Sequence, residues 1–222
     1  MAGDGRRIGP LRSGVMRFDD APVEIRPEIG AAFDREWERL AAPGTWWSGA
    51  ERVAIAGTAR AARLGEEPPS SDLPGPAAEA AALLGARPGR ARREWVESTA
   101  AELGDPAYVE LLGVTARTAA VDAFHRALGF ALPAFPEPLP GEPARASLPP
   151  LRRRAAWVPM PPGSIAHALG LVPAEDAAQE DLHGPLYLTY DGMGDMTFSR
   201  GLDRAQMELV AARTSALNEC FY

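Results

Sequence analysis

The sequence contains no lysine, so its 23 strongly basic side chains are all arginines. This absence excludes a Schiff-base nucleophile and a phosphate-binding lysine of the Walker type. The net charge of −7 argues against a nucleic-acid partner, because a surface that binds phosphates needs a clustered excess of cations. The composition therefore points away from nucleotide and nucleic-acid functions that depend on lysine or on a basic surface.

Cysteine is nearly absent, and the one cysteine, Cys220, has no partner in the chain for a disulfide. This usage is typical of a reducing compartment or of an isolated reactive thiol. No stretch approaches the ~18 consecutive apolar residues of a membrane span. Residues 1–20 also lack the apolar run of a signal peptide. We therefore expect a cytoplasmic protein without a membrane-spanning segment.

Strand patterns are almost missing too, because alternating apolar and polar residues occur only weakly, at residues 186–190. Helical periodicity recurs instead, and several helix starts carry capping signals such as Ser48 followed by Glu51. The sequence predicts an all-α fold. The expected helices begin close to Pro27, Gly49, Pro76, Arg90, Asp105, Ser164, Ala174 and Arg204.

Proline divides the chain into parts. Residues 1–22 form an N-terminal arm, and residues 23–129 form a first helical half without a thiol. Ten of the 22 prolines lie in residues 130–162, a density that neither a helix nor a central strand tolerates. This segment is predicted to be a linker that leads to a second helical half at residues 163–222.

The two halves show weak internal similarity at a shift of 155 residues. The shift aligns two capped helices with similar apolar faces, and it places Gly65 opposite Cys220. The matched pairs are Ser48 with Asp203, Glu51 with Gln206, Ile55 with Val210, and Ala56 with Ala211. We therefore expect two pseudo-repeated halves, of which only the second carries a cysteine.

Residues 203–222 form the most informative stretch of the chain. Asp203 is predicted to cap a helix, with the side chain of Gln206 reaching back to it. Five residues recur at helical spacing and are expected to face inward, and the helix carries Cys220 at its far end. These residues are Met207, Val210, Ala211, Thr214 and Leu217.

Residues 204–222, RAQMELVAARTSALNECFY, resemble the stretch that leads into the active site of the alkylhydroperoxidase D-like proteins of the carboxymuconolactone decarboxylase superfamily. Residues 46–63 are similar to the paired segment of the two-domain, peroxidase-related members. The resemblance implies an all-α helical bundle and thiol peroxidase or disulfide reductase chemistry through a Cys-x-x-Cys pair. It also implies a peroxide or disulfide substrate and a thiol reductant, with no cofactor and no metal.

Two residues carry over from the family motif. Cys220 corresponds to the first cysteine of the pair, and Glu208, twelve residues earlier, corresponds to the acid of a proton relay. The second cysteine and a histidine four residues beyond it would fall after Tyr222. Since a resolving thiol is needed for turnover, the chain is expected to be truncated, to borrow a partner's thiol, or to have lost activity. Of these we expect truncation within the motif.

Two alternatives remain open at this point. In the first, the chain is a non-catalytic assembly domain, in which Cys220 is a small buried residue and Glu208 is a solvated acid. In the other, the chain is a carboxymuconolactone decarboxylase-type protein without thiol chemistry. In every case we expect a homo-oligomer, because the terminal helix presents apolar residues such as Leu209 that need covering.

The histidines offer little for metal binding. Asp122 and His125 lie three residues apart on a predicted helix, but two ligands do not make a site. His167 and His183 have no partners that sequence spacing identifies. For His125 we therefore expect a capped or surface histidine.

Overall fold

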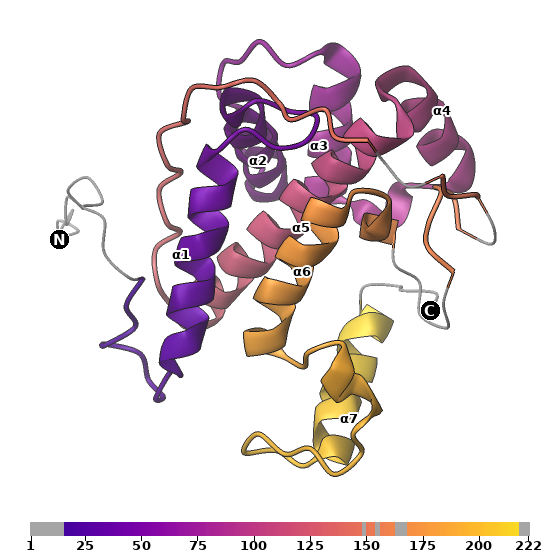
Figure 1. Ribbon diagram of the computed structural model, residues 1–222. Coiled ribbons are helices and arrows are strands. Elements are labelled where there is room, and N and C mark those ends of the chain that lie inside the picture. The colour runs from indigo at the N-terminus through magenta and orange to yellow at the C-terminus, as the bar shows by residue number, and fades with distance from the viewer. Residues whose placement is uncertain (1–15, 148–149, 154–155, 163–167, 218–222) are drawn as a thin grey trace, which may run out of the picture.

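The computed structural model describes residues 16–147, 150–153, 156–162 and 168–217. Within these ranges the chain forms seven α-helices and no strand, which confirms the predicted all-α class (Figure 1). The helices are α1 (Pro27–Ala41), α2 (Gly49–Leu64), α3 (Gly75–Ala86), α4 (Arg93–Leu103), α5 (Asp105–Ala127), α6 (Pro173–Leu186) and α7 (Arg204–Leu217). None of them combines the length and the apolar character that a bilayer-spanning helix needs.

Both predicted capping boxes are present. Ser48 Oγ accepts a hydrogen bond from the backbone N–H of Glu51, and Glu51 Oε2 accepts one from the Ser48 N–H at 2.8 Å. Before α7, the Gln206 N–H donates to Asp203 Oδ1 at 2.9 Å, and the Asp203 N–H donates to Gln206 Oε1 at 3.0 Å. Each box satisfies two backbone donors that the first turn of a helix would otherwise leave unpaired.

The apolar core has two parts that meet along α5. The larger part fills the space between α2, α3, α4 and α5, with Ile55, Leu111 and a series of alanines fully or almost fully buried. The smaller part joins α1, α5 and α6 through Phe33, Val121 and Leu182. Because α5 packs against five other helices, its polar side chains are buried together with its apolar ones.

Helices α2 and α3 approach each other closely. A Cβ atom added at Gly85 of α3 would lie only 2.6 Å from the Cα of Ala59 in α2 and 2.7 Å from its carbonyl carbon. The facing positions are also small, because Ala56, Ala77 and Ala80 are completely buried there. Small residues thus set the spacing of this helix pair.

The proline-rich segment runs as extended chain along α1 and α2 (Figure 1). The Leu139 N–H donates to Ala41 O at 2.8 Å, so the segment takes up a backbone acceptor at the end of α1. Phe135 stacks on Trp37 with ring centroids 6.2 Å apart, and the Arg60 guanidinium lies 3.7 Å from the centre of the Phe135 ring. The predicted linker therefore packs on the first group of helices.

Helix α6, which follows the proline-rich segment, packs against α1 and α5. Its Leu182 lies in the same apolar cluster as Phe33 and Val121. Asp181 of α6 accepts hydrogen bonds from Arg35 and Arg39 of α1 at 2.7 Å each. Helices from before and after the proline-rich segment thus share one core.

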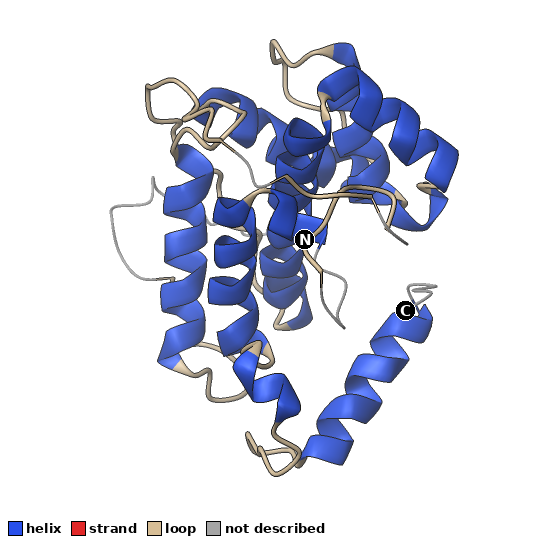
Figure 2. Ribbon diagram, turned by 45° about the vertical axis from the view of Figure 1, so that its right-hand side comes forward, coloured by secondary structure: helices blue, strands red, loops and turns tan. Residues whose placement is uncertain are grey.

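Helix α7 stands apart from the other helices (Figure 2). Met207 and Arg204 are its only buried residues, whereas Val210 is 58% and Leu217 66% exposed. The prediction that the face from Met207 to Leu217 packs inward is therefore confirmed at Met207 and wrong for Val210, Thr214 and Leu217. Helical periodicity identifies an apolar face but not the partner that covers it, and no other described helix lies against this one.

Candidate functional site

Glu208, the predicted relay acid, lies in the second turn of α7 with 46% of its side chain exposed. The hydroxyl of Tyr187, the residue after α6, donates a hydrogen bond to Glu208 Oε1 at 2.8 Å. The Nε of Arg204, one turn earlier on α7, lies 2.8 Å from the same oxygen and forms an ion pair with it. A phenol and a guanidinium therefore converge on one oxygen of this carboxylate.

Arg204 is itself anchored in the loop before α7. Its guanidinium donates to the carbonyl oxygens of Gly192, Met193 and Asp195 at 3.0 to 3.4 Å. Gly192 and Met193 belong to a short 3-10 helix, so Arg204 ties the end of that helix to the first turn of α7. Only 9% of the Arg204 side chain is exposed, and its position is accordingly well defined.

Cys220, the predicted nucleophile, lies outside the described residues, as does His167. Helix α7 is described to Leu217, nine residues after Glu208. On a straight helix twelve residues span about 18 Å, too far for contact between the carboxylate and the thiol. The structure therefore describes the surroundings of Glu208 but not those of Cys220.

A second cluster of charged side chains, which the sequence analysis did not identify, lies in the centre of the bundle. Its five members come from α1, α2, α5 and α6, and no side chain is more than 4% exposed. They alternate in charge along one chain of contacts, which we call the buried ion network. In the order of contact its members are Glu36, Arg117, Glu175, Arg52 and Glu110.

The contacts of this network are short and directional. Arg117 Nε donates to Glu36 Oε1 at 2.7 Å, and Arg117 Nη2 donates to Glu175. Arg52 Nη1 donates to Glu175 Oε1 at 3.0 Å and also to Glu110. Each carboxylate therefore contacts at least one guanidinium, as buried charges require.

Burial and partner charges act in opposite directions on these carboxylates. Burial raises the pKa of Glu110 above its ordinary value, against the opposing effect of the Arg52 charge. Burial acts upward on the pKa of Glu175 as well, but the charges of Arg117 and Arg52 outweigh it and hold this pKa below its ordinary value. Glu175 is therefore an ionised carboxylate held between two guanidinium groups.

Glycine makes room for the network. A Cβ at Gly113 of α5 would lie 2.5 Å from Glu175 Oε2 and 2.9 Å from Arg117 Nη1. A Cβ at Gly44 would collide with the carboxylate of Glu110. The network joins four helices. Because it is closed to solvent, it offers no surface to a substrate.

One signal in the sequence could have identified part of this network. Glu36 lies three positions after Phe33 and one before Trp37, both of which are buried on the inner side of α1. A charged residue within an apolar stripe needs a buried partner of opposite charge. The spacing identifies one partner, Arg39, which lies three residues later on α1 and pairs with Glu36 at 3.0 Å, but it does not identify Arg117, which lies on another helix.

The Asp122 and His125 pair does not form a metal site. Asp122 accepts hydrogen bonds from Arg60 at 2.7 and 2.9 Å and a further one from Arg63. The Nδ1 of His125 lies 2.8 Å from Val121 O, and burial lowers the pKa of this ring. Nowhere in the described ranges do three or more His, Cys, Asp or Glu side chains gather as metal ligands would.

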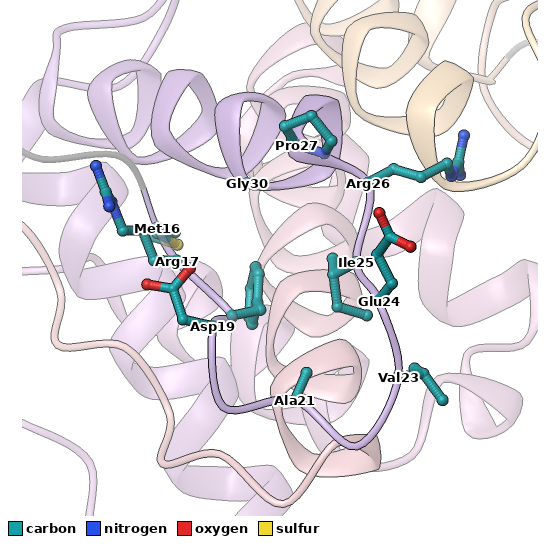
Figure 3. Close-up of a pocket in the computed structure, with 11 residues that line it drawn as sticks. Met16, Arg17, Asp19, Ala21, Val23, Glu24, Ile25, Arg26, Pro27 and Gly30 are labelled. Atoms are coloured by element: carbon teal, nitrogen blue, oxygen red, sulfur yellow. The ribbon is translucent and has the colours of Figure 1, made fainter.

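A cavity of about 470 Å³ lies within the loop that precedes α1 (Figure 3). Residues 16–19 and 23–27 line it, with both acidic and basic side chains at its rim. The backbone N–H of Met16 donates to the Asp34 carboxylate at 2.8 Å, which attaches the loop to α1. None of its lining residues belongs to the buried ion network or contacts Glu208.

Two charged sites thus differ in their access to solvent. The buried ion network is closed, whereas the carboxylate of Glu208 is half exposed and held at one oxygen. No family model, no curated protein and no solved structure matches the chain.

Proposed function

We propose that this chain is an alkylhydroperoxidase D-like helical bundle of the carboxymuconolactone decarboxylase superfamily, with two pseudo-repeated halves, and acts as a thiol peroxidase or disulfide reductase. The observation that carries the proposal concerns Glu208, which lies on α7, the helix that precedes Cys220 in the sequence. Its carboxylate is half exposed and is contacted by Tyr187 and Arg204. The capping boxes that open α2 and α7 support the repeat. A single cysteine favours the cytoplasm, where thiols stay reduced.

In the proposed reaction the Cys220 thiolate attacks one oxygen of a peroxide. The S–O bond forms as the O–O bond breaks, so the sulfur is oxidised to a sulfenic acid and the peroxide is reduced to an alcohol or water. Glu208 takes the proton of the thiol and returns it to the leaving oxygen. Contact between the two groups requires the chain to leave the helix axis after Leu217, because a straight helix would keep them about 18 Å apart.

Turnover needs a second thiol. It attacks the sulfenic acid, releases water and forms a disulfide, which a thiol reductant then reduces. Because Cys220 is the single cysteine of these 222 residues, the second thiol belongs to a partner or to a longer form of the chain. The chain itself accounts for the oxidation step.

Peroxide treatment in the presence of a sulfenic-acid probe tests the oxidation step. We expect Cys220 to be labelled, and Glu208→Gln to slow labelling by roughly 10²-fold, the lower end of general acid–base effects. Glu102→Gln, which changes an exposed acid on α4, is the control and should label at the wild-type rate. Mass spectrometry measures the rate, and an unlabelled Cys220 in the wild type would contradict the proposed function.

A second candidate function is assembly without catalysis, in which a second copy of the chain covers α7. The observation that favours it is the exposure of Leu209, Val210 and Leu217, at 72%, 58% and 66%, on a helix that packs against no other described α-helix. Exposed apolar surface of this kind is characteristic of interfaces between protein chains. This candidate predicts assembly that is unaffected by Cys220→Ser.

Substitution on α7 tests the assembly. We expect Leu209→Gln to shift the protein towards the monomer in analytical ultracentrifugation, because it removes apolar area from the contact. Leu139→Gln changes a leucine that is 54% exposed outside α7 and should leave the oligomeric state unchanged. Equal sedimentation of both variants and the wild type would argue against an interface at α7.

A further inference from the structure

We infer that an exposed arginine segment of this chain binds an exposed acidic loop of a second copy, so that copies associate head to tail. The arginine segment is residues 87–93, from the end of α3 to the first residue of α4, and the acidic loop is residues 66–72, between α2 and α3. The inference goes beyond the proposed function, because it uses neither Cys220 nor Glu208. It also goes beyond the assembly candidate, because α7 takes no part in it.

The arginine segment concentrates positive charge on a chain whose net charge is −7. Its four arginines are all exposed, and residues 87–93 contain no acidic residue. In the part of the chain that the structure describes, no ion pair reaches the side chains of Arg87, Arg90 and Arg92, whereas Arg93 pairs with Glu97 at 3.5 Å. The guanidinium groups are therefore open to carboxylates from outside the chain, which they bind well.

Backbone hydrogen bonds hold the arginine segment in a defined turn. The Arg87 N–H donates to Leu83 O at 2.8 Å at the end of α3. The Arg90 N–H donates to Arg87 O at 2.9 Å, and the Ala91 N–H donates to Pro88 O at 3.0 Å. Ala91 also packs against the larger apolar core. The guanidinium groups thus extend from an ordered backbone, which lowers the entropy that is lost on binding.

The acidic loop carries the opposite charge. Glu66, Glu67 and Asp72 are exposed, and no ion pair reaches them from the described residues. Residues 64–86 contain no basic residue, so no cation lies close to the loop in sequence. The loop is anchored on α2, because a Cβ added at Gly57 would lie 2.9 Å from the ring of Pro69. Both charged surfaces therefore have a fixed backbone and unpaired side chains.

The two surfaces do not pair within one copy. Helix α3 separates them, and its 12 residues span about 18 Å, whereas an ion pair needs a separation of about 4 Å or less. Each copy therefore presents one positive and one negative surface to its neighbours, and the same contact can repeat from copy to copy. Because it consists of exposed ion pairs, the contact should be weak and sensitive to salt.

The charge of the rest of the chain favours this partner over a large polyanion. A membrane surface or a nucleic acid at the arginine segment would also face acidic side chains elsewhere on the chain, and the net charge of −7 would repel it. A short acidic loop meets the arginine segment alone. The acidic loop of a second copy has the size and the charge that this requires.

A charge exchange tests the contact by sedimentation velocity. We expect the mean mass of the wild type to rise with concentration at low salt and to fall at 1 M salt, where the screening length is about 3 Å. Arg90→Glu combined with Arg92→Glu, and separately Glu66→Arg combined with Glu67→Arg, should each weaken association by roughly 10-fold or more, because like charges then face each other. A mixture of the two variants should associate again, because each supplies the charge that the other has lost.

Arg17→Glu combined with Arg126→Glu is the matched control. Both arginines are exposed outside the arginine segment, and their replacement changes the net charge by the same amount. This control should associate as the wild type does. An equal loss in the control and in the Arg90 and Arg92 variant would overturn the inference, because it would show a general effect of net charge.

The other outcomes are equally decisive. A wild-type mass that is independent of both concentration and salt overturns the inference, as does a mixture of the exchanged variants that stays apart. If a hexaglutamate peptide binds to such a non-associating wild type, the arginine segment serves an acidic partner other than a second copy. Association through α7 is the same in all of these proteins, so the differences among them report the arginine segment and the acidic loop.

Discussion

Arg117→Met is expected to lower the free energy of unfolding by about 3 to 5 kcal/mol, the cost of removing one partner from a buried ion pair. The Arg117 side chain is completely buried and contacts Glu36 and Glu175, so its removal leaves two buried carboxylates short of a positive charge. Methionine has a similar length and lacks the charge, so loss of charge dominates over loss of volume. Urea denaturation followed by circular dichroism measures the effect.

Arg126→Met serves as the control for this prediction. Arg126 lies on the same helix, is exposed and is expected to contribute less than about 1 kcal/mol through the helix dipole. A double-mutant cycle sharpens the test, because Glu36→Gln removes a buried carboxylate that keeps only its contact with Arg39 once Arg117 is replaced. We expect the double variant to lose less stability than the sum of the single losses, by roughly 0.5 to 3 kcal/mol. Strict additivity would argue that the two side chains do not interact.

Gly85→Ala is expected to lower the free energy of unfolding by roughly 1 to 3 kcal/mol, as overpacking of a close helix contact does. The added Cβ would lie 2.6 Å from the Cα of Ala59 and closer still to its carbonyl oxygen. These are backbone atoms of α2, so no side-chain rotation can relieve the collision. Helices α2 and α3 would have to move apart, which loosens the contacts among the buried alanines between them.

Gly75→Ala is the matched control, since it introduces the same methyl group at the first residue of α3. No atom lies within 4 Å of its added Cβ, and its backbone has no positive φ. We expect a change of less than about 1 kcal/mol, because the reduced entropy of the unfolded chain and the restriction that Pro76 places on a preceding alanine act in opposite directions. If thermal unfolding placed Gly85→Ala and Gly75→Ala at the same midpoint, the close approach of α2 and α3 would not hold in solution.

The helices and their caps could be predicted because they depend on residues close together in the sequence. Ser48 and Glu51, like Asp203 and Gln206, are three residues apart, and each pair forms its hydrogen bonds within one turn. The absence of strands from the part of the chain that the structure describes followed in the same way from the missing alternation of polar and apolar residues. Local spacing is sufficient for these features.

The environment of α7 could not be predicted on this basis. The apolar spacing from Met207 to Leu217 is helical, but whether that face is buried depends on the path of the chain before it. The turn after α6 directs α7 away from the bundle, and the face is left exposed. Periodicity carries no information about that direction.

The sequence by itself determined the all-α class, the caps, the single thiol and the twelve-residue spacing between Glu208 and Cys220. The tertiary structure alone decided that Arg117 lies between Glu36 and Glu175, 81 and 58 residues away, and that Tyr187 holds Glu208 from another element. The reason is physical: a cap is made within one turn of backbone. An ion pair or a phenol contact between helices exists only when packing of the apolar core has brought those helices together.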